Sequence, residues 1–264
     1  MLAINEILNK AKKYNLSGDF LYSVYGLSSE EHFDALIVAP GWIPEKIFAR
    51  KSAEIECVME KTGYTSYKVE FEGLHLAWIK CGVSSSNLID AMLSAAEAAV
   101  DRIIFVGAVG ALDADIHIGE FCTPSESYAY DGASLYLQER LDTANFGRTV
   151  IPGCMDYIDE VIARAESGNI EIKKRRTFCT DSIICEYAHL DEIKATGAEL
   201  IEMETAAFYE CLKLMDKKGI ALMCVSDNSA SGVPLVRRTP EQRKNFDDCR
   251  TLNVPEVIKI ACEC

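Results

Sequence analysis

The alternation of two kinds of segment constrains the fold of this chain more than any other feature. Short apolar runs rich in β-branched residues alternate with longer segments in which apolar residues recur at helical spacing. This pattern is typical of a mostly parallel sheet covered by helices. We therefore predict an α/β fold with central strands at residues 35–39, 74–81, 103–107, 199–203 and 220–226, and a weaker candidate at 171–179.

Helices are expected at residues 44–60, 86–100, 155–167, 205–217 and 239–261. The sequence Thr-Pro-Glu-Gln at 239–242 combines an N-cap hydroxyl, proline at the first helical position and glutamine in the capping-box position. The three serines at 84–86 offer caps for a second helix. The 264 residues contain no linker or repeat, so residues 31–264 are predicted to form one domain. A helix and polar loop at 1–30 pack either on this domain or on a neighbouring subunit.

The charge balance excludes polyanionic partners. Lys and Arg number 27 against 41 Asp and Glu, a net charge of −14 that repels nucleic acid and anionic membranes. The first 20 residues have helical spacing without the apolar core of a signal peptide. The apolar stretches, such as residues 103–109, are far shorter than the roughly 20 residues of a membrane helix. We expect a soluble, cytoplasmic protein.

The 11 cysteines are scattered through apolar runs and lack the paired spacing of a zinc site. They are interpreted as reduced thiols of a cytosolic protein, and no metal or cofactor is expected. Cys262 and Cys264 could instead form a disulfide or bind a metal. A free pair of thiols is favoured there, because a chain terminus fixes no geometry.

Four predicted strand ends carry unusual loops, and ligands of open parallel sheets bind beyond the carboxyl ends of the strands. The first loop is a tight turn at residues 40–45. The second is the glycine-rich segment 107–111, whose small residues let backbone N–H groups approach a ligand. Glycine-rich turns also simply reverse the chain, so these two loops are weak signals by themselves.

The third loop places Glu202 and Glu204 on either side of Met203, between an apolar strand and an apolar helix. Buried carboxylates are costly unless something hydrogen-bonds them. A ribose would donate its hydroxyls to Glu204 and stack on Met203. Acids in the first turn of a helix are also favourable with the helix dipole, and the residues alone leave both interpretations open.

The fourth loop begins with Ser226 and Asp227, at the end of another apolar strand. A buried aspartate has its pKa raised by desolvation and can donate a proton to a leaving group. Taken singly, Asp227 is better explained as an N-cap or turn residue.

Taken in order, these segments resemble the signature of the nucleoside phosphorylase superfamily, which includes purine nucleoside phosphorylases, uridine phosphorylases and methylthioadenosine nucleosidases. The segments are 38–41, 104–107 with 110–111, 201–204 and 225–227. The stretch 130–135 is similar to one in uridine phosphorylases. The resemblance runs from about Leu21 to the C-terminus, and the ordered Glu-Met-Glu block is its most specific part.

The resemblance implies a single-domain three-layer α/β/α sandwich with a mixed, mostly parallel sheet, assembled as a homodimer or a hexamer built as a trimer of dimers. It also implies that Glu204 holds the ribose 2′ and 3′ hydroxyls, with Met203 under the sugar and Glu202 beside the base or sugar. Asp227 matches the acid that protonates N7 of a departing purine. The residues assigned to the base, or to the loop over it, are Ser226, Ile183 and Arg243.

The expected phosphate site departs from the family pattern. Where the phosphorylases carry an arginine and a following hydroxyl residue around the strand-end glycine, this chain has Phe105 and Ala108. The arginine after the first glycine turn corresponds to Glu45, so that only Gly41 remains of the site. A glutamate repels phosphate.

We therefore predict hydrolysis, with Glu45 as a general base that activates water. A solvated acid in the first helical turn is an equally compatible role for Glu45. Lys46 or Lys68 is an alternative source of positive charge for phosphate.

Asp227 favours a purine, because a pyrimidine has no N7 to protonate, whereas the stretch 130–135 points toward uridine. The predicted function is thus hydrolytic cleavage of the N-glycosidic bond of a ribonucleoside, with a purine favoured. The alternatives are a purine or uridine phosphorylase with a rebuilt phosphate site, and a nucleoside-binding protein without turnover. The expected ligands are a nucleoside and either water or phosphate.

Overall fold

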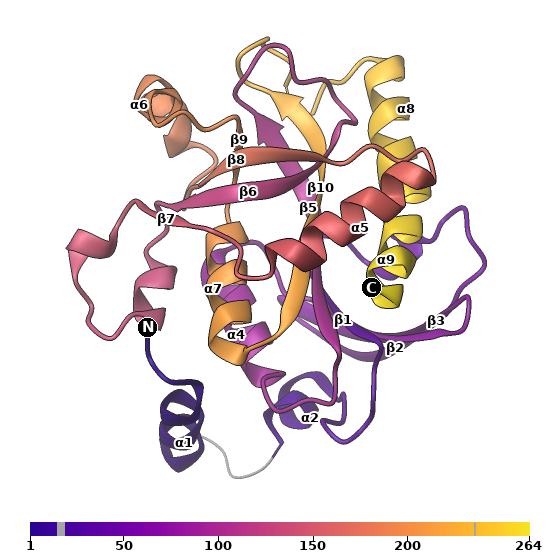
Figure 1. Ribbon diagram of the computed structural model, residues 1–264, viewed down its shortest axis with the longest axis vertical. Helices are drawn as coiled ribbons and strands as arrows, with labels where there is room; N and C mark the ends of the chain where they lie inside the picture. The colour runs from indigo at the N-terminus through magenta and orange to yellow at the C-terminus, as the bar shows by residue number, and fades with distance from the viewer. Residues whose placement is uncertain (15–18, 235) are drawn as a thin grey trace.

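A computed structural model of the chain describes residues 1–14, 19–234 and 236–264. The described residues form one ten-stranded sheet with helices on both faces (Figure 1). The strands are β1 (Ala35–Ala39), β2 (Glu54–Lys61), β3 (Tyr64–Phe71), β4 (Leu74–Lys80), β5 (Arg102–Ala111), β6 (Phe121–Ala129), β7 (Arg148–Val150), β8 (Lys173–Cys179), β9 (Leu200–Glu202) and β10 (Lys218–Asn228). The predicted α/β fold with a mixed sheet is confirmed.

Helices α4 and α7 pack together on one face of the sheet, and α5 and α9 on the other (Figure 1). The α-helices are α1 (Ile4–Tyr14), α2 (Phe20–Tyr25), α3 (Pro44–Ile47), α4 (Ser85–Ser94), α5 (Met155–Ser167), α6 (Leu190–Ala195), α7 (Thr205–Met215), α8 (Pro240–Asp248) and α9 (Val254–Glu263). Short 3₁₀ turns are η1 (Ala133–Leu137), η2 (Thr143–Asn145) and η3 (Cys185–His189), and η4 (Cys249–Asn253) is a π turn between α8 and α9. No helix within the described ranges is long and apolar enough to span a membrane.

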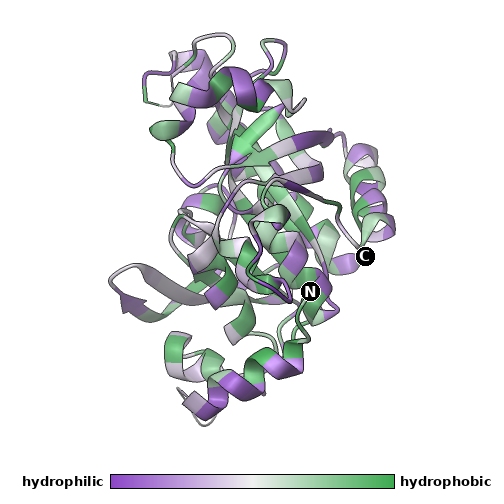
Figure 2. Cartoon of the chain, turned by 90° about the vertical axis from the view of Figure 1, so that its left-hand side faces the viewer, coloured by the Kyte–Doolittle hydropathy of each residue, from purple (hydrophilic) through white to green (hydrophobic). Residues whose placement is uncertain are grey.

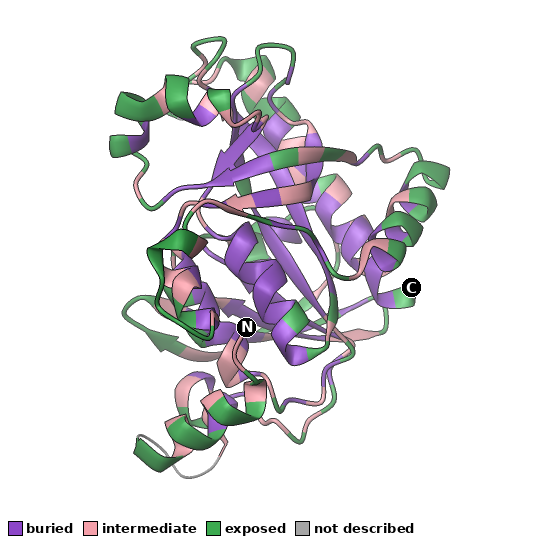
Figure 3. Ribbon diagram, turned by 60° about the vertical axis from the view of Figure 1, so that its left-hand side comes forward, coloured by how far each residue is buried: buried purple, intermediate pink, exposed green. Residues whose placement is uncertain are grey.

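Five strands of the sheet close on themselves. β10 pairs with β5 in parallel and with β6 antiparallel, β6 pairs with β8, and β9 joins β8 to β5. The central strands and the inner faces of α4 and α7 are buried, whereas the edge strand β2 and the outer helices carry exposed residues (Figure 3). Hydrophobic residues follow the same strands in Figure 2. This closure brings the ends of β5, β9 and β10 to one place.

The predicted helix at 44–60 is wrong. Only α3 is helical there, and Glu54–Lys61 is strand β2, paired antiparallel with β3 at the edge of the sheet. A bulge between Cys57 and Met59 breaks the alternation of the strand, so that its half-buried residues fall at helical spacing. Strands β3, β6 and β7 were not predicted either.

The other central elements lie close to their predicted positions. Thr239 and Gln242 form a complete capping box at the start of α8, and Ser84 caps α4. The predicted helix 86–100 ends early, at Ser94. The N-terminal segment packs on its own domain, because Leu21 and Leu27 are buried in the main core.

Candidate active site

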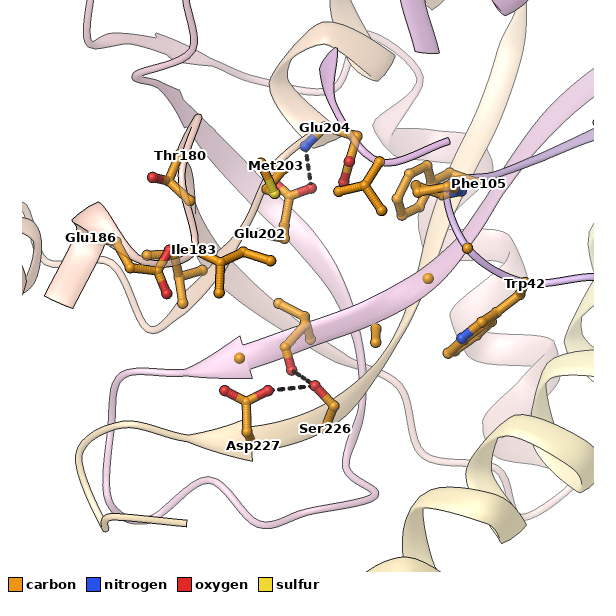
Figure 4. A pocket seen from close by; sticks show the side chains of 18 of the residues that line it. Trp42, Phe105, Thr180, Ile183, Glu186, Glu202, Met203, Glu204, Ser226 and Asp227 are labelled. Carbon is orange, nitrogen blue, oxygen red and sulfur yellow. Dashed lines mark hydrogen bonds between the residues drawn. The ribbon is translucent and has the colours of Figure 1, made fainter. Parts of the chain in front are cut away.

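A cavity of about 210 Å³ opens where β5, β9 and β10 end (Figure 4). One side, here called the acidic end, is lined by Thr180, Ile183, Glu186 and Asp227. The opposite side, the apolar end, is lined by Pro40, Gly41, Trp42, Phe105 and Ala108. The segment Glu202–Met203–Glu204 lies between the two ends. The fold thus brings together all four loops that the sequence singled out.

The carboxylate of Glu202 organises the start of helix α7. Its Oε2 accepts hydrogen bonds from the backbone N–H groups of Glu204 (2.7 Å) and Thr205 (2.8 Å). Its Oε1 accepts from the Thr205 hydroxyl (2.8 Å) and from the Cys179 thiol (2.7 Å). These four bonds use the acceptor capacity of the carboxylate, so Glu202 positions the neighbouring residues rather than offering a free oxygen to a ligand.

Glu204 is held at the centre of the pocket and is only 4% exposed. Its Oε1 accepts a 2.8 Å bond from the backbone N–H of Ser84, and the backbone N–H of Met203 also acts on the carboxyl group to lower its pKa. Ser84 adopts a φ of 140°, a conformation that L residues rarely adopt. Burial, followed by repulsion from Glu202, raises the pKa of Glu204 well above its ordinary value. A buried carboxyl group that lines a cavity favours a hydroxyl or cationic partner from a ligand.

Asp227 lies at the end of β10, where Ser226 and Gly110 are its neighbours. Its Oδ1 accepts a 2.5 Å bond from the hydroxyl of Ser226. Burial raises the pKa of Asp227, while the Ser226 bond and the nearby charge of Arg238 lower it, and the net direction is upward. Gly110 on β5 faces this carboxylate, and a Cβ there would lie 3.1 Å from Asp227 Oδ2. The bare glycine therefore leaves room for the Asp227 side chain.

The apolar end contains no donor comparable to an arginine. Phe105 is 1% exposed and packs against Phe208, with ring centroids 5.7 Å apart. The Phe105 ring also covers Gly107, where a Cβ would come within 2.9 Å of it. Trp42 forms the outer wall (Figure 4). The aromatic ring thus fills the place that the sequence pattern assigned to a phosphate-binding side chain.

Two predicted residues are not brought into the pocket. Glu45 lies exposed in the first turn of α3 and does not line the cavity; its charge acts on Cys57 and Tyr67, which belong to β2 and β3. The expectation that Glu45 activates water is therefore not supported by the geometry of the subunit. Arg243 is exposed on α8, also outside the cavity.

Arg238 contacts a pocket residue but does not line the cavity either. Its Nε donates a 2.5 Å bond to the backbone carbonyl of Ser226, and its guanidinium lies 4.2 Å from the ring centroid of Phe246. Lys68, one of the two lysines considered as a source of positive charge for phosphate, forms a 2.7 Å salt bridge with Glu31. Neither Lys46 nor Lys68 lines the cavity.

The structure adds a carboxyl group that the sequence did not reveal. Glu186 lies on η3, is 8% exposed and lines the pocket beside Ile183. Burial, with a further contribution from Asp227, raises the pKa of Glu186 to about 7. The available signal was an acid inside the apolar run Ile183–Tyr187, directly after a strand.

Four carboxyl groups therefore line the cavity, from Glu186, Glu202, Glu204 and Asp227, and none of its described lining residues is Lys, Arg or His. Within the described parts of the chain, no cluster of His, Cys, Asp or Glu has the arrangement of a metal site. Such a site offers carboxyl groups to the hydroxyls and nitrogens of a ligand, and its lining provides no cation to an anionic ligand.

Comparison with known proteins identifies the family of this chain. Residues 35–264 match the phosphorylase superfamily. The chain belongs to this superfamily. The purine nucleoside phosphorylase DeoD-type of Bacillus velezensis is 21% identical over 187 residues, covering 67% of this chain and 75% of that protein. As a superfamily member, the chain is an enzyme that cleaves glycosidic bonds.

Solved structures agree on the fold. The uridine phosphorylase of Vibrio fischeri ES114 superposes with a TM-score of 0.73 at 16% identity, covering 90% of this chain and 95% of that chain. A structure of the same protein with 6-hydroxy-1-naphthoic acid gives a TM-score of 0.68 at 16% identity, over 90% and 93% of the two chains. The superfamily fold is thus retained at low sequence identity.

Proposed function

We propose that this superfamily member cleaves the N-glycosidic bond of a purine ribonucleoside with water as the nucleophile. The observation that carries the proposal is the lining of the pocket, which has four carboxyl groups and, among the described residues, no cation. Cleavage of a C–N glycosidic bond passes through a sugar with oxocarbenium character, which carboxylates stabilise. A dianionic phosphate finds no counter-charge in the same cavity.

The sugar is assigned to the middle of the pocket. Glu204 lines the cavity with its Oε1 bonded to Ser84, and its carboxyl group is assigned the vicinal ribose hydroxyls. Met203 lines the cavity beside Glu204 and offers an apolar surface to the ring. Glu202 fixes the backbone of Glu204 through a 2.7 Å bond, so it acts on the sugar through its neighbour.

The base is assigned to the acidic end. The raised pKa of Asp227 keeps a proton available at higher pH than an ordinary aspartate would. A purine leaves more readily once N7 is protonated, and a pyrimidine has no such atom. Ile183, which is 46% exposed at the pocket wall, supplies an apolar contact for the base.

The attacking water is assigned to the apolar end, between Gly41, Phe105 and Ala108. Because no carboxylate reaches this end, the chemistry depends on activating the leaving base rather than the nucleophile. Water is a sufficient nucleophile once positive charge has developed on the sugar.

A second candidate is phosphorolysis, favoured by the names of the similar proteins, which are a purine nucleoside phosphorylase and a uridine phosphorylase. Product analysis separates the two candidates. Purified protein is incubated with a purine nucleoside in phosphate-free buffer and in saturating phosphate. Free ribose in both conditions supports hydrolysis, and ribose 1-phosphate overturns it. No base release from a panel of purine and pyrimidine nucleosides would instead support a nucleoside-binding protein.

The proposal extends to the assembly and location of the protein. A homo-oligomer, either a dimer or a hexamer, remains the proposed state, and its mass in solution can be measured by light scattering. The 11 cysteines are free thiols, which favours the reducing environment of the cytoplasm.

A further inference from the structure

Glu204 occupies the position directly before helix α7, where a side chain ordinarily caps the helix. The first N–H groups of a helix have no partner within it, and a carboxylate at that end is attracted to them and to the helix dipole. The side chain of Glu204 nevertheless makes no capping hydrogen bond to α7. Its Oε1 accepts its 2.8 Å bond from the backbone N–H of Ser84, the N-cap residue of α4. Other groups must therefore satisfy the start of α7.

Glu202 and Cys179 provide the caps that Glu204 does not. Glu202 Oε2 accepts bonds from the backbone N–H groups of Glu204 (2.7 Å) and Thr205 (2.8 Å), the first of which is drawn in Figure 4. The next N–H group along the chain, that of Ala206, donates to Cys179 Sγ at 3.2 Å. Three successive N–H groups at the start of α7 are thus bonded by a side chain of β9 and a side chain of β8.

The Cys179 thiol also links the two caps to each other. The parallel pairing of β8 with β9 places Cys179 beside Glu202, and its thiol donates a 2.7 Å bond to Glu202 Oε1. Burial, followed by the charge of Glu202, raises the pKa of this thiol well above its ordinary value, so it keeps its proton and remains a donor. Burial also raises the pKa of Glu202, and the bond from Cys179 opposes that rise more than any other.

The neighbouring hydroxyl groups do not duplicate the role of the thiol. Thr205 donates its hydroxyl to Glu202 Oε1 at 2.8 Å and lies 2.8 Å from the buried hydroxyl of Ser127 on β6. Neither hydroxyl reaches the N–H group of Ala206, which bonds to the Cys179 sulfur. A buried N–H group without a partner is costly. If the thiol were lost, the carboxyl group of Glu204, at the N-cap position, would be placed to turn back and accept this N–H.

We propose that Cys179 is a positioning residue: by capping α7 together with Glu202, it leaves the carboxyl group of Glu204 directed at the ligand of the cavity instead of at its own helix. The identity of that ligand as a ribonucleoside rests on the proposed function, whereas the capping role does not. The tests therefore include two that need no substrate.

The first test is a double-mutant cycle on thermal stability. Cys179→Ala and Glu204→Ala are made singly and together, and Tm is measured for each protein at neutral pH. In the Cys179→Ala background, Glu204 should become the cap of Ala206. Its removal should therefore lower Tm by roughly 2 to 4 °C more than it does in the wild-type background. Effects that simply add would overturn the proposal.

Cys211 provides the matched control for this cycle. Its thiol is fully buried on α7 and makes no hydrogen bond to another described residue. Cys211→Ala removes a buried thiol of the same size without touching the caps, so its effect on Tm should add to that of Glu204→Ala. If Cys211→Ala couples to Glu204→Ala as strongly as Cys179→Ala does, the coupling reflects packing alone and the proposal fails.

A measurement on the folded wild-type protein covers the case in which Cys179→Ala does not fold. The S–H stretching band of Cys179 is identified by infrared difference against Cys179→Ser, and that of Cys211 against Cys211→Ala. Donation to a carboxyl group should place the Cys179 band at lower wavenumber than the Cys211 band. A Cys179 band at or above the position of the Cys211 band would overturn the proposal.

The last test measures base release from adenosine or inosine. In Cys179→Ala, kcat/KM should fall about 10- to 100-fold, because Glu204 is misplaced. Cys179→Ser, whose hydroxyl both donates and accepts, should recover most of this loss. Cys211→Ala should stay within about twofold of wild type.

Wild-type kcat/KM in a folded Cys179→Ala protein would overturn the positioning role. If the wild-type protein releases no base at all, the proposed function fails separately. The Tm cycle and the infrared bands still decide the role of Cys179 in that case.

Discussion

The two ends of the pocket are built from opposite kinds of residue. The acidic end combines Asp227 with Glu186, two carboxyl groups whose pKa values are raised by burial. The apolar end presents Trp42, Phe105 and Ala108, with no titratable group. One end can therefore supply protons, whereas the lining side chains of the other only shape the cavity.

This difference indicates where the enzyme lowers the barrier. Proton donors at the acidic end act on the leaving base, and the carboxylate of Glu204 acts on the sugar between the ends. The apolar end contributes neither charge nor a base. Catalysis should therefore depend strongly on residues at the middle and acidic end and weakly on residues near the nucleophile, an order that mutation can test.

The largest effect is expected for Glu204→Gln. An amide keeps the bond from the Ser84 backbone but loses charge-assisted bonds to two ribose hydroxyls, each worth roughly 1.5 to 3 kcal/mol. Turnover should become undetectable while the circular dichroism spectrum stays unchanged. Base release is measured chromatographically over long incubations. A mutant with near wild-type rates would show that the sugar does not bind at the middle of the pocket.

Asp227→Asn sharpens the assignment of the acidic end to the leaving base. Cleavage of purine nucleosides should fall by about 10² to 10⁴-fold, because the general acid is lost. A nitrophenyl riboside, whose leaving group needs no proton, should be affected much less. The two rates are measured in parallel with the same protein. Equal losses would mean that Asp227 orders the site without donating a proton.

Glu186→Gln tests the acidic end through stability. The folded pKa of Glu186 is raised to about 7, so the folded state holds its proton more tightly than the unfolded state does. At low pH the Glu186 carboxyl group is neutral in both the folded and the unfolded protein, so it does not affect stability. As the pH rises from the pKa of the unfolded state to the folded-state pKa of about 7, ionisation of Glu186 in the unfolded state increasingly opposes folding. The mutant should therefore gain up to about 3 kcal/mol over wild type at alkaline pH and little at acid pH. Urea unfolding at both pH values measures this, and an equal difference at the two would contradict it.

The smallest effect is expected for Glu45→Gln. Its side chain is exposed and outside the pocket, so kcat and KM should remain within about twofold of wild type. A large loss of kcat without loss of nucleoside affinity would place Glu45 at the nucleophile after all. That outcome would break the contrast between the two ends, because the apolar end would then have a base.

Much of the site could be predicted from the order of its segments along the chain. Gly41, Phe105, Ala108, Ile183, Met203, Glu204, Ser226 and Asp227 all line one cavity. The parallel strands carry their carboxyl ends to the same region, so loops after different strands were expected to meet there. Glu202 also lines the cavity, but its four hydrogen bonds, which give it a positioning role, depend on Cys179 of another strand.

Residues that reach the site from outside the strand-end motifs could not be predicted in this way. Glu186 becomes a pocket residue only because the fold brings η3 to the cavity that the end of β10 also lines. Arg237, Arg238 and Arg243 all follow Asp227 in the sequence, and only the fold places the charge of Arg238 near Asp227 while Arg243 lies exposed on α8. The sequence of a loop gives its charged residues but does not determine which of their side chains point into the cavity.

The sequence by itself determined the buried strands and the capped helices of this protein. β1 and α5 occupy their predicted residues, because a continuous apolar run or an amphipathic segment has one favourable way to be buried. Only the tertiary structure decided that Glu54–Lys61 is a strand, since pairing with β3 overrides the helical spacing that a bulge creates. It also decided that Asp227 and Glu186 share one end of a cavity, because the distance between two carboxyl groups, and hence their pKa values, is set by packing between elements far apart in the chain.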